Sequence, residues 1–470
     1  MRGTMSGKWS VLIVITLVSF ITNLDATIVI VGLPTLTADL DMSMSFGLWT
    51  ITSFYITSTV LLLPSGRWSD IIGAKRIFIW GFAIFTAATT LCGAAGSGEW
   101  LIGFRFLQGA GAAMALAAST PLLMQTFPPQ QLGFAIGVNN ISWVTGSLIG
   151  PVAGGALIGE FGWRSMFYVV VPFGIIGLTA GIAVLRNKTS ESEEKTDWPG
   201  VFTFALGLVA LLVALSEGPQ WGWTSIPTII LFAAFILFWI VFVIIEMRTR
   251  HPLFQLSLLN YRTYVVGLGI TMSYCIGYFA VTILLTLYLQ EAQGLSPLET
   301  GLLFIPLSAP QLFTAPLGGR LADRMGPAPL ILTGSSLIGL SLLLLGQLGS
   351  EMSYLAVMIP LAVISAATGL SWPSLAKVVM TAVPKRHEGA ASGMFWTVYN
   401  MCRAISQALA LVIVQAAVGT AQDGTDMLRN RLIQATTNGF TVFSAFLGIA
   451  VVLGVLLLRP HVQSSRHTTD

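Results

Sequence analysis

The sequence has few charged residues, and this scarcity decides its broad class. Only 9% of the 470 residues are Asp, Glu, Lys or Arg, whereas soluble globular chains carry about 25%. Apolar residues make up 54% of the chain, the mean hydropathy is +0.81, and long apolar runs recur throughout. These features exclude an ordinary soluble domain and predict an all-α polytopic membrane protein.

Cysteine and histidine are also scarce. The three cysteines, Cys92, Cys275 and Cys402, lie far apart inside predicted spans, so we expect neither a disulfide framework nor a metal site. The four histidines fall between or beyond the predicted spans, and neither a Ser-His-Asp set nor a His-rich cluster is present. The sequence therefore does not favour an enzyme.

Hydropathy predicts fourteen membrane-spanning helices. The first is too long for a cleaved signal peptide and is taken as a span. An even number of spans places both chain ends on one side of the membrane. The predicted ranges are residues 10–31, 46–65, 76–96, 100–124, 133–158, 163–185, 198–216, 225–246, 263–290, 297–318, 328–348, 352–375, 388–418 and 435–458.

The distribution of Lys and Arg predicts the orientation. Eighteen of the 23 lie in the two tails and in the loops on the same side as the tails, three lie in the opposite loops, and Arg105 and Arg403 lie within spans. Cytoplasmic loops carry the excess of positive charge. We therefore expect a multi-pass protein of the cytoplasmic (inner) membrane with both termini in the cytoplasm.

The chain contains an internal repeat. "PSGRWSDIIGAKR" (Pro64–Arg76) and "LGGRLADRMGPAP" (Leu317–Pro329) share the pattern G-R-x-x-D-x-x-G, and Gly66 and Gly319 are 253 residues apart. Near the same offset, "GFAIGVNN" (Gly133–Asn140) matches "GAASGMFW" (Gly389–Trp396). Repeated halves around a central site are the architecture of secondary transporters.

The repeat also predicts the domain organisation. An N-terminal six-helix half is expected at residues 1–185, and a C-terminal six-helix half with a cytoplasmic tail at 263–470. Residues 186–262 then hold two inserted helices with cytoplasmic linkers.

Four motifs occur in order along the first half. They are "LDATIVIVGLP" (Leu24–Pro34), the repeated loop pattern after the second helix, "RFLQGAGA" (Arg105–Ala112) and "GSLIGPVAGG" (Gly146–Gly155). Over essentially the whole chain, the sequence resembles the major facilitator superfamily, and within it the fourteen-helix drug:proton antiporter branch. The resemblance implies the major facilitator fold, with two pseudo-symmetric halves that rock to give alternating access. One departure is the thirteenth helix, where "RAISQALA" from Arg403 lacks the glycines of many relatives.

The pseudosymmetry of the repeat and the spacing of the helix-five glycines predict roles for two of these motifs. Asp70 and Asp323 are expected to cap helices of the opposite half near Gly389 and Gly133, which would close the cytoplasmic side. The glycines of the helix-five motif, spaced i, i+4, i+8, are expected either to seal the outer side between the halves or simply to pack. The cytoplasmic gating residues are Gly66, Arg67, Asp70, Gly73, Lys75, Arg76 and Asp323, and the antiporter motif comprises Gly146, Gly150, Pro151, Gly154 and Gly155.

Asp25 is the carboxylate placed deepest in a predicted span, and such residues mark functional sites by default. At about 1.5 Å per residue, Asp25 lies roughly 12 Å below the outer end of its helix and Arg105 about 8 Å below that of its own. The matched depths predict an ion pair. It is either a static brace or a proton-coupling site, in which Arg105 keeps Asp25 ionised until the two separate and burial favours protonation.

Polar and aromatic side chains within spans are candidates to line a central cavity. Aromatic rings suit lipophilic cations, and apolar concave pockets suit many drugs. Gln108 either orients Arg105, lines the cavity or joins two helices; Arg403 is solvated by the cavity, attracts an anionic substrate group or bonds to carbonyls. The candidates are Asn23, Trp49, Tyr55, Gln108, Asn139, Asn140, Trp143, Tyr274, Tyr278, Gln311, Trp396, Tyr399, Asn400 and Arg403.

The sequence thus predicts a proton-coupled exporter of amphipathic drugs, dyes or antiseptics, with lipophilic cations favoured. The alternative is export of an endogenous metabolite or lipid by the same machinery. The expected partners are the lipid bilayer, protons and a small amphipathic substrate. We expect a monomer that binds no nucleic acid and uses no cofactor beyond the proton gradient.

Overall fold

The computed structural model describes residues 2–185, 197–249, 252, 254, 256–384, 388–418 and 425–458. This part of the chain is almost entirely helical, and no strand occurs in it. The first seven helices are α1 (Arg2–Asp39), α2 (Met44–Trp68), α3 (Ala74–Gly93), α4 (Gly98–Thr126), α5 (Pro129–Phe161), α6 (Ser165–Tyr168) and α7 (Val170–Val184).

The remaining helices follow in two groups. The inserted pair is α8 (Trp198–Trp221) and α9 (Ile226–Arg248), and a 3₁₀ turn (Leu256–Asn260) leads to the second half. The second half contains α10 (Arg262–Leu287), α11 (Pro297–Leu303), α12 (Ile305–Met325), α13 (Pro327–Leu345), α14 (Tyr354–Thr381), α15 (Glu388–Val418) and α16 (Thr425–Leu458).

Each of the fourteen predicted ranges contains a helix. Two ranges are divided, residues 163–185 into α6 and α7 and residues 297–318 into α11 and α12. In the described residues, thirteen helical stretches are long and apolar enough to cross a membrane, and α2 has a shorter apolar stretch, Phe46–Leu62. The predicted all-α polytopic class is confirmed.

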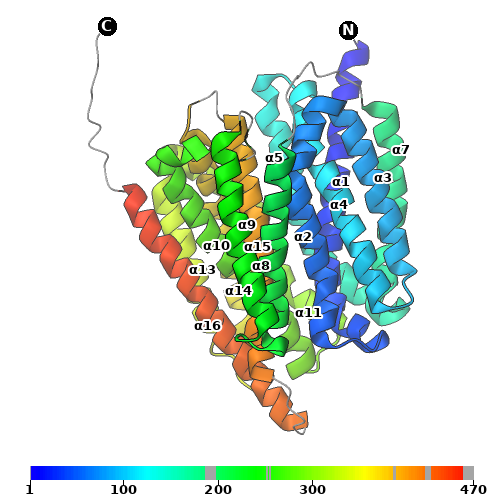
Figure 1. The fold of residues 1–470 in the computed structure, drawn as a ribbon, viewed down its shortest axis with the longest axis vertical. Helices are drawn as coiled ribbons and strands as arrows, with labels where there is room; N and C mark the ends of the chain where they lie inside the picture. Colours follow the sequence, from blue (N-terminus) through cyan, green and yellow to red (C-terminus); the bar gives the residue numbers. More distant parts are fainter. Residues whose placement is uncertain are drawn as a thin grey trace.

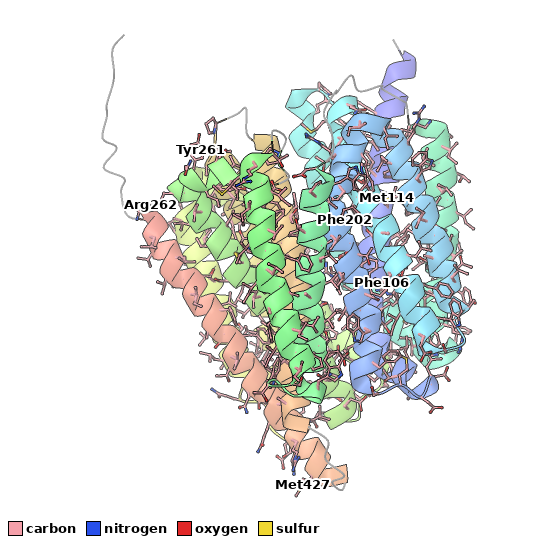
Figure 2. All side chains as sticks on the ribbon, viewed as in Figure 1. Phe106, Met114, Phe202, Tyr261, Arg262 and Met427 are labelled. Carbon is pink, nitrogen blue, oxygen red and sulfur yellow. The ribbon has the colours of Figure 1, made fainter. Side chains whose placement is uncertain are left out.

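Large apolar side chains cover the outside of the bundle. Figure 2 shows Phe106 on α4 and Phe202 on α8 at the outer surface, where their side chains are exposed. Soluble monomers rarely expose contiguous apolar patches larger than a few hundred Å². The surface is therefore suited to contact with lipid tails.

The helices form two bundles with the inserted pair placed across them (Figure 1). α8 contacts α2 of the first half and α15 of the second half. Near the end opposite the chain termini, Trp49 Nε1 on α2 donates a hydrogen bond of 2.7 Å to Glu217 Oε1 on α8. α1 begins and α16 ends at the same end of the molecule, the upper end in Figure 1, as an even number of spans requires.

The repeated glycines occupy equivalent bends. Gly73 has φ 106° before α3, and Gly326 has φ 81° before α13. A side chain is strained at such angles, so glycine is the residue that turns the chain into the next helix. The predicted loop after the second helix is a π turn, Ser69–Gly73, which continues α2, and Asp323 lies inside α12.

Candidate functional site

A buried ion pair lies between α1 and α4. Arg105 Nη1 donates to Asp25 Oδ2 at 2.8 Å, and Arg105 Nε donates to the carbonyl oxygen of Thr50 on α2 at 2.8 Å. The side chains of Asp25 and Arg105 are 0% and 1% exposed. The ion pair that was predicted from the matched depths of Asp25 and Arg105 is therefore present in the structure.

Gln108 completes this network. Its Nε2 donates to Asp25 Oδ1 at 2.9 Å and to Thr89 Oγ1 at 2.7 Å, while its Oε1 accepts from Arg105 Nη1 at 2.5 Å. Both carboxylate oxygens of Asp25 thus have partners, which a buried ion pair needs to offset its desolvation. Gln108 is fully buried, and of the three expected alternatives the structure shows two, since its side chain bonds Arg105 and joins α4 to α1 and α3. It holds both members of the pair.

We expect Gln108→Leu to lower the free energy of unfolding by about 1–3 kcal/mol, because Asp25, Arg105 and Thr89 each lose a buried partner. The measurement is thermal unfolding of the purified protein in detergent. Gln311→Leu is the matched control, because the Gln311 side chain makes no hydrogen bond with the described residues, and a change within about 0.5 kcal/mol is expected. Equal effects of the two substitutions would contradict the network.

Glycines bring α4 close enough to α2 for this contact. Arg105 and Gln108 are three residues apart and share one face of α4. A Cβ added at Gly109 would collide with the backbone of Phe54 on α2. The ring of Phe54 lies 4.4 Å from Arg105 Cζ. The small residues after Arg105 therefore allow the guanidinium to enter the space between α1, α2 and α4.

The glycines of the helix-five motif pack against two different helices. Added Cβ atoms at Gly146, Gly150 and Gly154 would meet α1, within the same half. The predicted contact between the halves is therefore wrong for these three glycines, because residues spaced i, i+4, i+8 all face one helix. Gly155 lies about 100° further round, and its Cβ would lie 2.6 Å from Leu298 Cα on α11 of the other half.

The halves meet at the end opposite the chain termini. A Cβ at Gly301 on α11 would collide with the carbonyl group of Pro151 on α5, so the two backbones are in close contact. Gln290 Nε2 of the second half also donates 3.0 Å to the carbonyl oxygen of Val31 on α1. Pro151 and Gly155 thus belong to a closed inter-half contact, which lies toward the lower end in Figure 1.

The second half contains an aromatic cluster, which we define as Tyr274, Tyr278, Phe279, Trp372, Trp396 and Tyr399. The rings of Tyr274 and Tyr278 stack at 6.2 Å, and Tyr399 lies 5.3 Å from each of Phe279, Trp372 and Trp396. Tyr274 Oη donates to Thr368 Oγ1 at 3.0 Å, which fixes its ring. Four predicted cavity residues are thus brought together.

Arg403 lies beside this cluster. Its Cζ is 4.6 Å from the ring centroid of Tyr55 on α2 and 5.0 Å from that of Phe279. The residue is 6% exposed, and no described residue forms an ion pair or hydrogen bond with it. Bonding to carbonyl groups, one of the expected alternatives, is therefore not observed in the described residues.

Other predicted cavity residues have structural partners. Asn23 Nδ2 donates to Trp143 O at 2.5 Å and to Ser147 Oγ at 2.6 Å, so in this structure the buried side chain joins α1 to α5. Asn400 Nδ2 donates to Trp396 O within α15 at 2.8 Å. Asn139 Oδ1 is buried and has no partner among the described residues, while the Asn140 side chain lies outside them.

The basic residues of the gating motif lie at the end of the bundle that carries the termini. Lys75 Nζ donates 3.0 Å to Ile182 O and so ties α3 to α7, whereas Arg76 is exposed. The side chains of Asp70 and Asp323 lie outside the described residues, so their predicted capping of opposite helices stays a prediction.

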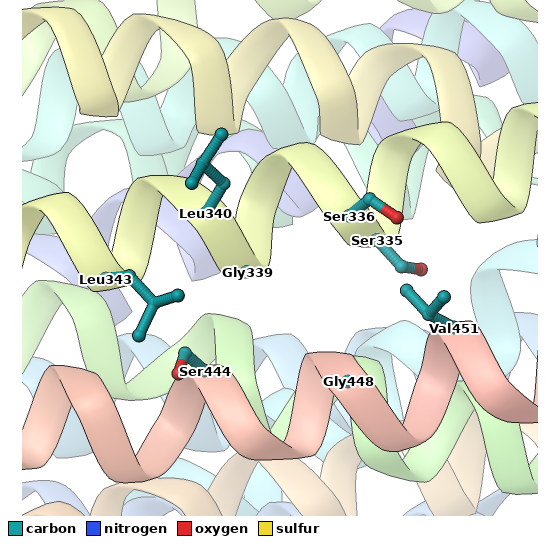
Figure 3. Close-up of a pocket in the computed structure, with 8 residues that line it drawn as sticks. All are labelled: Ser335, Ser336, Gly339, Leu340, Leu343, Ser444, Gly448 and Val451. Atoms are coloured by element: carbon teal, nitrogen blue, oxygen red, sulfur yellow. The ribbon is translucent and has the colours of Figure 1, made fainter.

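Two cavities lie away from the buried charges. A groove of about 250 Å³ separates α13 from α16, and Figure 3 shows Ser335, Gly339 and Ser444 along it. A second cavity, of about 440 Å³, is lined by Phe46, Trp49 and Ile102 with Glu99 and Glu217. Asp25 and Arg403 line neither cavity. We therefore define the candidate site by these buried charged residues and not by a cavity.

Sequence reasoning missed Phe54, Thr89, Phe279 and Trp372. A phenylalanine or threonine in an apolar span has no distinguishing pattern, since both are common at helix contacts. Their roles follow from the neighbours that folding gives them: Arg105 for Phe54, Gln108 for Thr89 and the aromatic cluster for the other two.

Two helical bundles with buried charges between spans are typical of secondary transporters. The profile of the Major Facilitator Superfamily matches residues 15–274 and again residues 266–469. The chain belongs to this superfamily.

Over most of its length, the chain is similar to proteins that are named as transporters or resistance proteins. The multidrug resistance protein Stp of Mycobacterium tuberculosis (strain CDC 1551 / Oshkosh) is 31% identical over 380 residues, which are 80% of this chain and 70% of Stp. The riboflavin transporter RibZ of Clostridioides difficile (strain 630) is 28% identical over 86% of this chain and 88% of its own. The structure of a bacterial homologue of the human lysosomal transporter Spinster matches with a TM-score of 0.68, 16% identity and 96% coverage of both chains, which supports the fold.

Proposed function

We propose that the protein exports amphipathic small molecules in exchange for protons. The observation that carries the proposal is the Asp25–Arg105–Gln108 network, a fully buried carboxylate held by one cation and one amide. Intramembrane carboxylates are costly and form proton relays in transporters. The similarity to Stp supports drug-like cargo.

In this mechanism the ion pair opens and closes once in each cycle. While Arg105 touches Asp25, the carboxylate stays ionised, because a nearby opposite charge favours the charged form. When the halves rock and the contacts of Arg105 change, the buried carboxylate favours the neutral form and takes up a proton. Re-forming the pair releases that proton on the other side.

Helix α2 provides a direct route between this network and the seam of the two halves. Phe54 contacts Arg105 of the first half, and the next residue, Tyr55, contacts Arg403 of the second half. In the proposed mechanism, a shift of α2 would change both contacts together, and coupling requires such an element with two arrangements.

The proposed orientation places both termini in the cytoplasm of a cell whose inner membrane holds the protein. The basis is the excess of Lys and Arg in the loops on the side of the termini. The contact between α5 and α11 then closes the outer side, and cargo enters from the cytoplasm.

Export of a metabolite is the second candidate, and one observation favours it. RibZ, named a riboflavin transporter, is 28% identical to this chain over 88% of its own length. The same network and the same rocking of halves would drive this export, so only the cargo differs.

The test is a dye and drug accumulation screen in a host that lacks its own efflux pumps. We expect cells with the protein to accumulate severalfold less of some amphipathic compounds than cells with an empty vector. Collapse of the pH gradient with a potassium–proton exchanging ionophore should remove the difference. A protein without effect on any compound would favour the metabolite candidate, and export unaffected by the ionophore would refute proton coupling.

A further inference from the structure

We propose that Arg403 binds an anionic group of the cargo, so that the exported compounds are amphipathic organic anions. Such a compound has a planar apolar body and one carboxylate, phenolate or sulfonate. This inference rests on the proposed function and adds the substrate class to it.

The first argument is that Arg403 is buried and has no counter-charge among the described residues. It is 6% exposed, its Nε is fully buried, and no described residue accepts a hydrogen bond from it. The other intramembrane arginine, Arg105, bonds to a carboxylate, an amide and a carbonyl group. A buried cation without such partners is costly, and a site for an anionic ligand explains why it is present.

The second argument is the geometry around the guanidinium. Its neighbours Tyr55 and Phe279 offer aromatic rings, which attract the cation but provide no oxygen for its donors. The five N–H groups of arginine form a planar fork that matches a carboxylate. The donors of Arg403 thus remain available to a ligand oxygen.

One further unsatisfied donor lies at the same place. The hydroxyl group of Tyr55, whose ring contacts Arg403, is buried without a partner among the described residues. Tyr55 belongs to the first half and Arg403 to the second. An anion that accepts from both would bridge the halves, where a secondary transporter binds its substrate.

The third argument is the aromatic cluster, which suits a planar apolar body. Phe279, which contacts Arg403, has its ring centroid 5.2 Å from that of Tyr278 and 5.3 Å from that of Tyr399. The rings of these two tyrosines continue into those of Tyr274 and Trp396. Aromatic walls with few fixed polar groups are typical of small-molecule sites. The expectation of lipophilic cations is replaced, because a cationic cargo here would meet the like charge of Arg403.

Two dyes with the same xanthene core test this inference: fluorescein, which is anionic, and rhodamine 6G, which is cationic. Binding to the purified full-length protein is measured by fluorescence anisotropy, and pH-driven export is measured in proteoliposomes. For Arg403→Gln we expect fluorescein binding about tenfold weaker or more, because a charge-assisted hydrogen bond is lost. Rhodamine binding should stay the same or strengthen. Arg262→Gln, which removes an exposed arginine at the start of α10, should leave both dyes unaffected.

The outcomes distinguish a failure of the anion-site inference from a failure of the proposed export function. Export of rhodamine alone by the wild type, or equal weakening of both dyes in Arg403→Gln, would overturn the anion site while leaving export intact. Export of neither dye would count against the proposed function and against the inference that rests on it. If Arg403→Gln does not fold, Arg403→Lys decides: it keeps the charge but not the fork, and fluorescein binding alone should weaken severalfold.

Discussion

Asp25→Asn is expected to reduce pH-driven efflux in proteoliposomes to the background of protein-free vesicles. The amide cannot take up and release a proton at the position where Asp25 now bonds Arg105 and Gln108. Exchange of labelled for unlabelled substrate without a pH gradient should persist, because the rocking of a loaded transporter does not need the proton. The measurement is a comparison of these two fluxes in the same vesicles.

The substitution also leaves Arg105 buried without its carboxylate, which costs about 3–5 kcal/mol. The double variant Asp25→Asn with Arg105→Gln removes both charges and should recover most of this stability while remaining inactive in pH-driven efflux. Asp39→Asn is the matched control, because Asp39 pairs with Arg164 at 3.0 Å in an exposed position. Full pH-driven efflux by Asp25→Asn would refute the proton role, and loss of exchange together with efflux would favour a brace.

Gly155→Leu is expected to prevent closure of the halves at the end opposite the termini. An added side chain would push against the backbone of Pro297 and Leu298 on α11, which cannot move aside as a flexible side chain can. Export should fall strongly, and spin-label distances between α5 and α11 should increase by several ångströms, since the two backbones lie in contact.

Gly159→Leu is the control for this substitution. It lies one turn further along α5, where an added Cβ meets nothing within 4 Å, so near wild-type export and unchanged distances are expected. If Gly155→Leu kept the wild-type spin-label distances, the contact between α5 and α11 would not be the closure of the halves.

The number of spans and the pairing of Asp25 with Arg105 were predictable from the sequence. Both predictions depend only on position along the chain. Hydropathy locates the spans, and the rise per residue gives the depth of each charged residue below the end of its helix. Helix boundaries agree within about four residues for α2 to α5, as α4 (Gly98–Thr126) against the predicted 100–124 shows, but α1 (Arg2–Asp39) extends well beyond both ends of the predicted 10–31. The two divided spans were missed in the sequence although each break has a proline just after it, Pro306 after Phe304 and Pro172 after Val169, and proline removes a backbone hydrogen-bond donor from a helix.

The tertiary structure decided which face of each helix contacts lipid and which face contacts other helices. Lipid tails and the interior of the bundle are both apolar, so the sequence pattern does not separate the outward face of a span from its inward face. Gly154 and Gly155 are neighbours in the chain, yet one packs on α1 and the other on α11. Asn23 and Gln108 were candidates to line a cavity, and in this structure they join helices.

By itself, the sequence determined that this protein crosses the membrane many times, has two repeated halves and carries one acid at the depth of an arginine. These follow from composition and spacing, which are the same in any fold of the chain. Only the tertiary structure brought Tyr55 of one half to Arg403 of the other and left Arg403 without a counter-charge among the residues that the structure describes. The physical reason is that a residue's partners depend on the rotation and packing of helices far apart in sequence, and this packing places the guanidinium of Arg403 among aromatic rings.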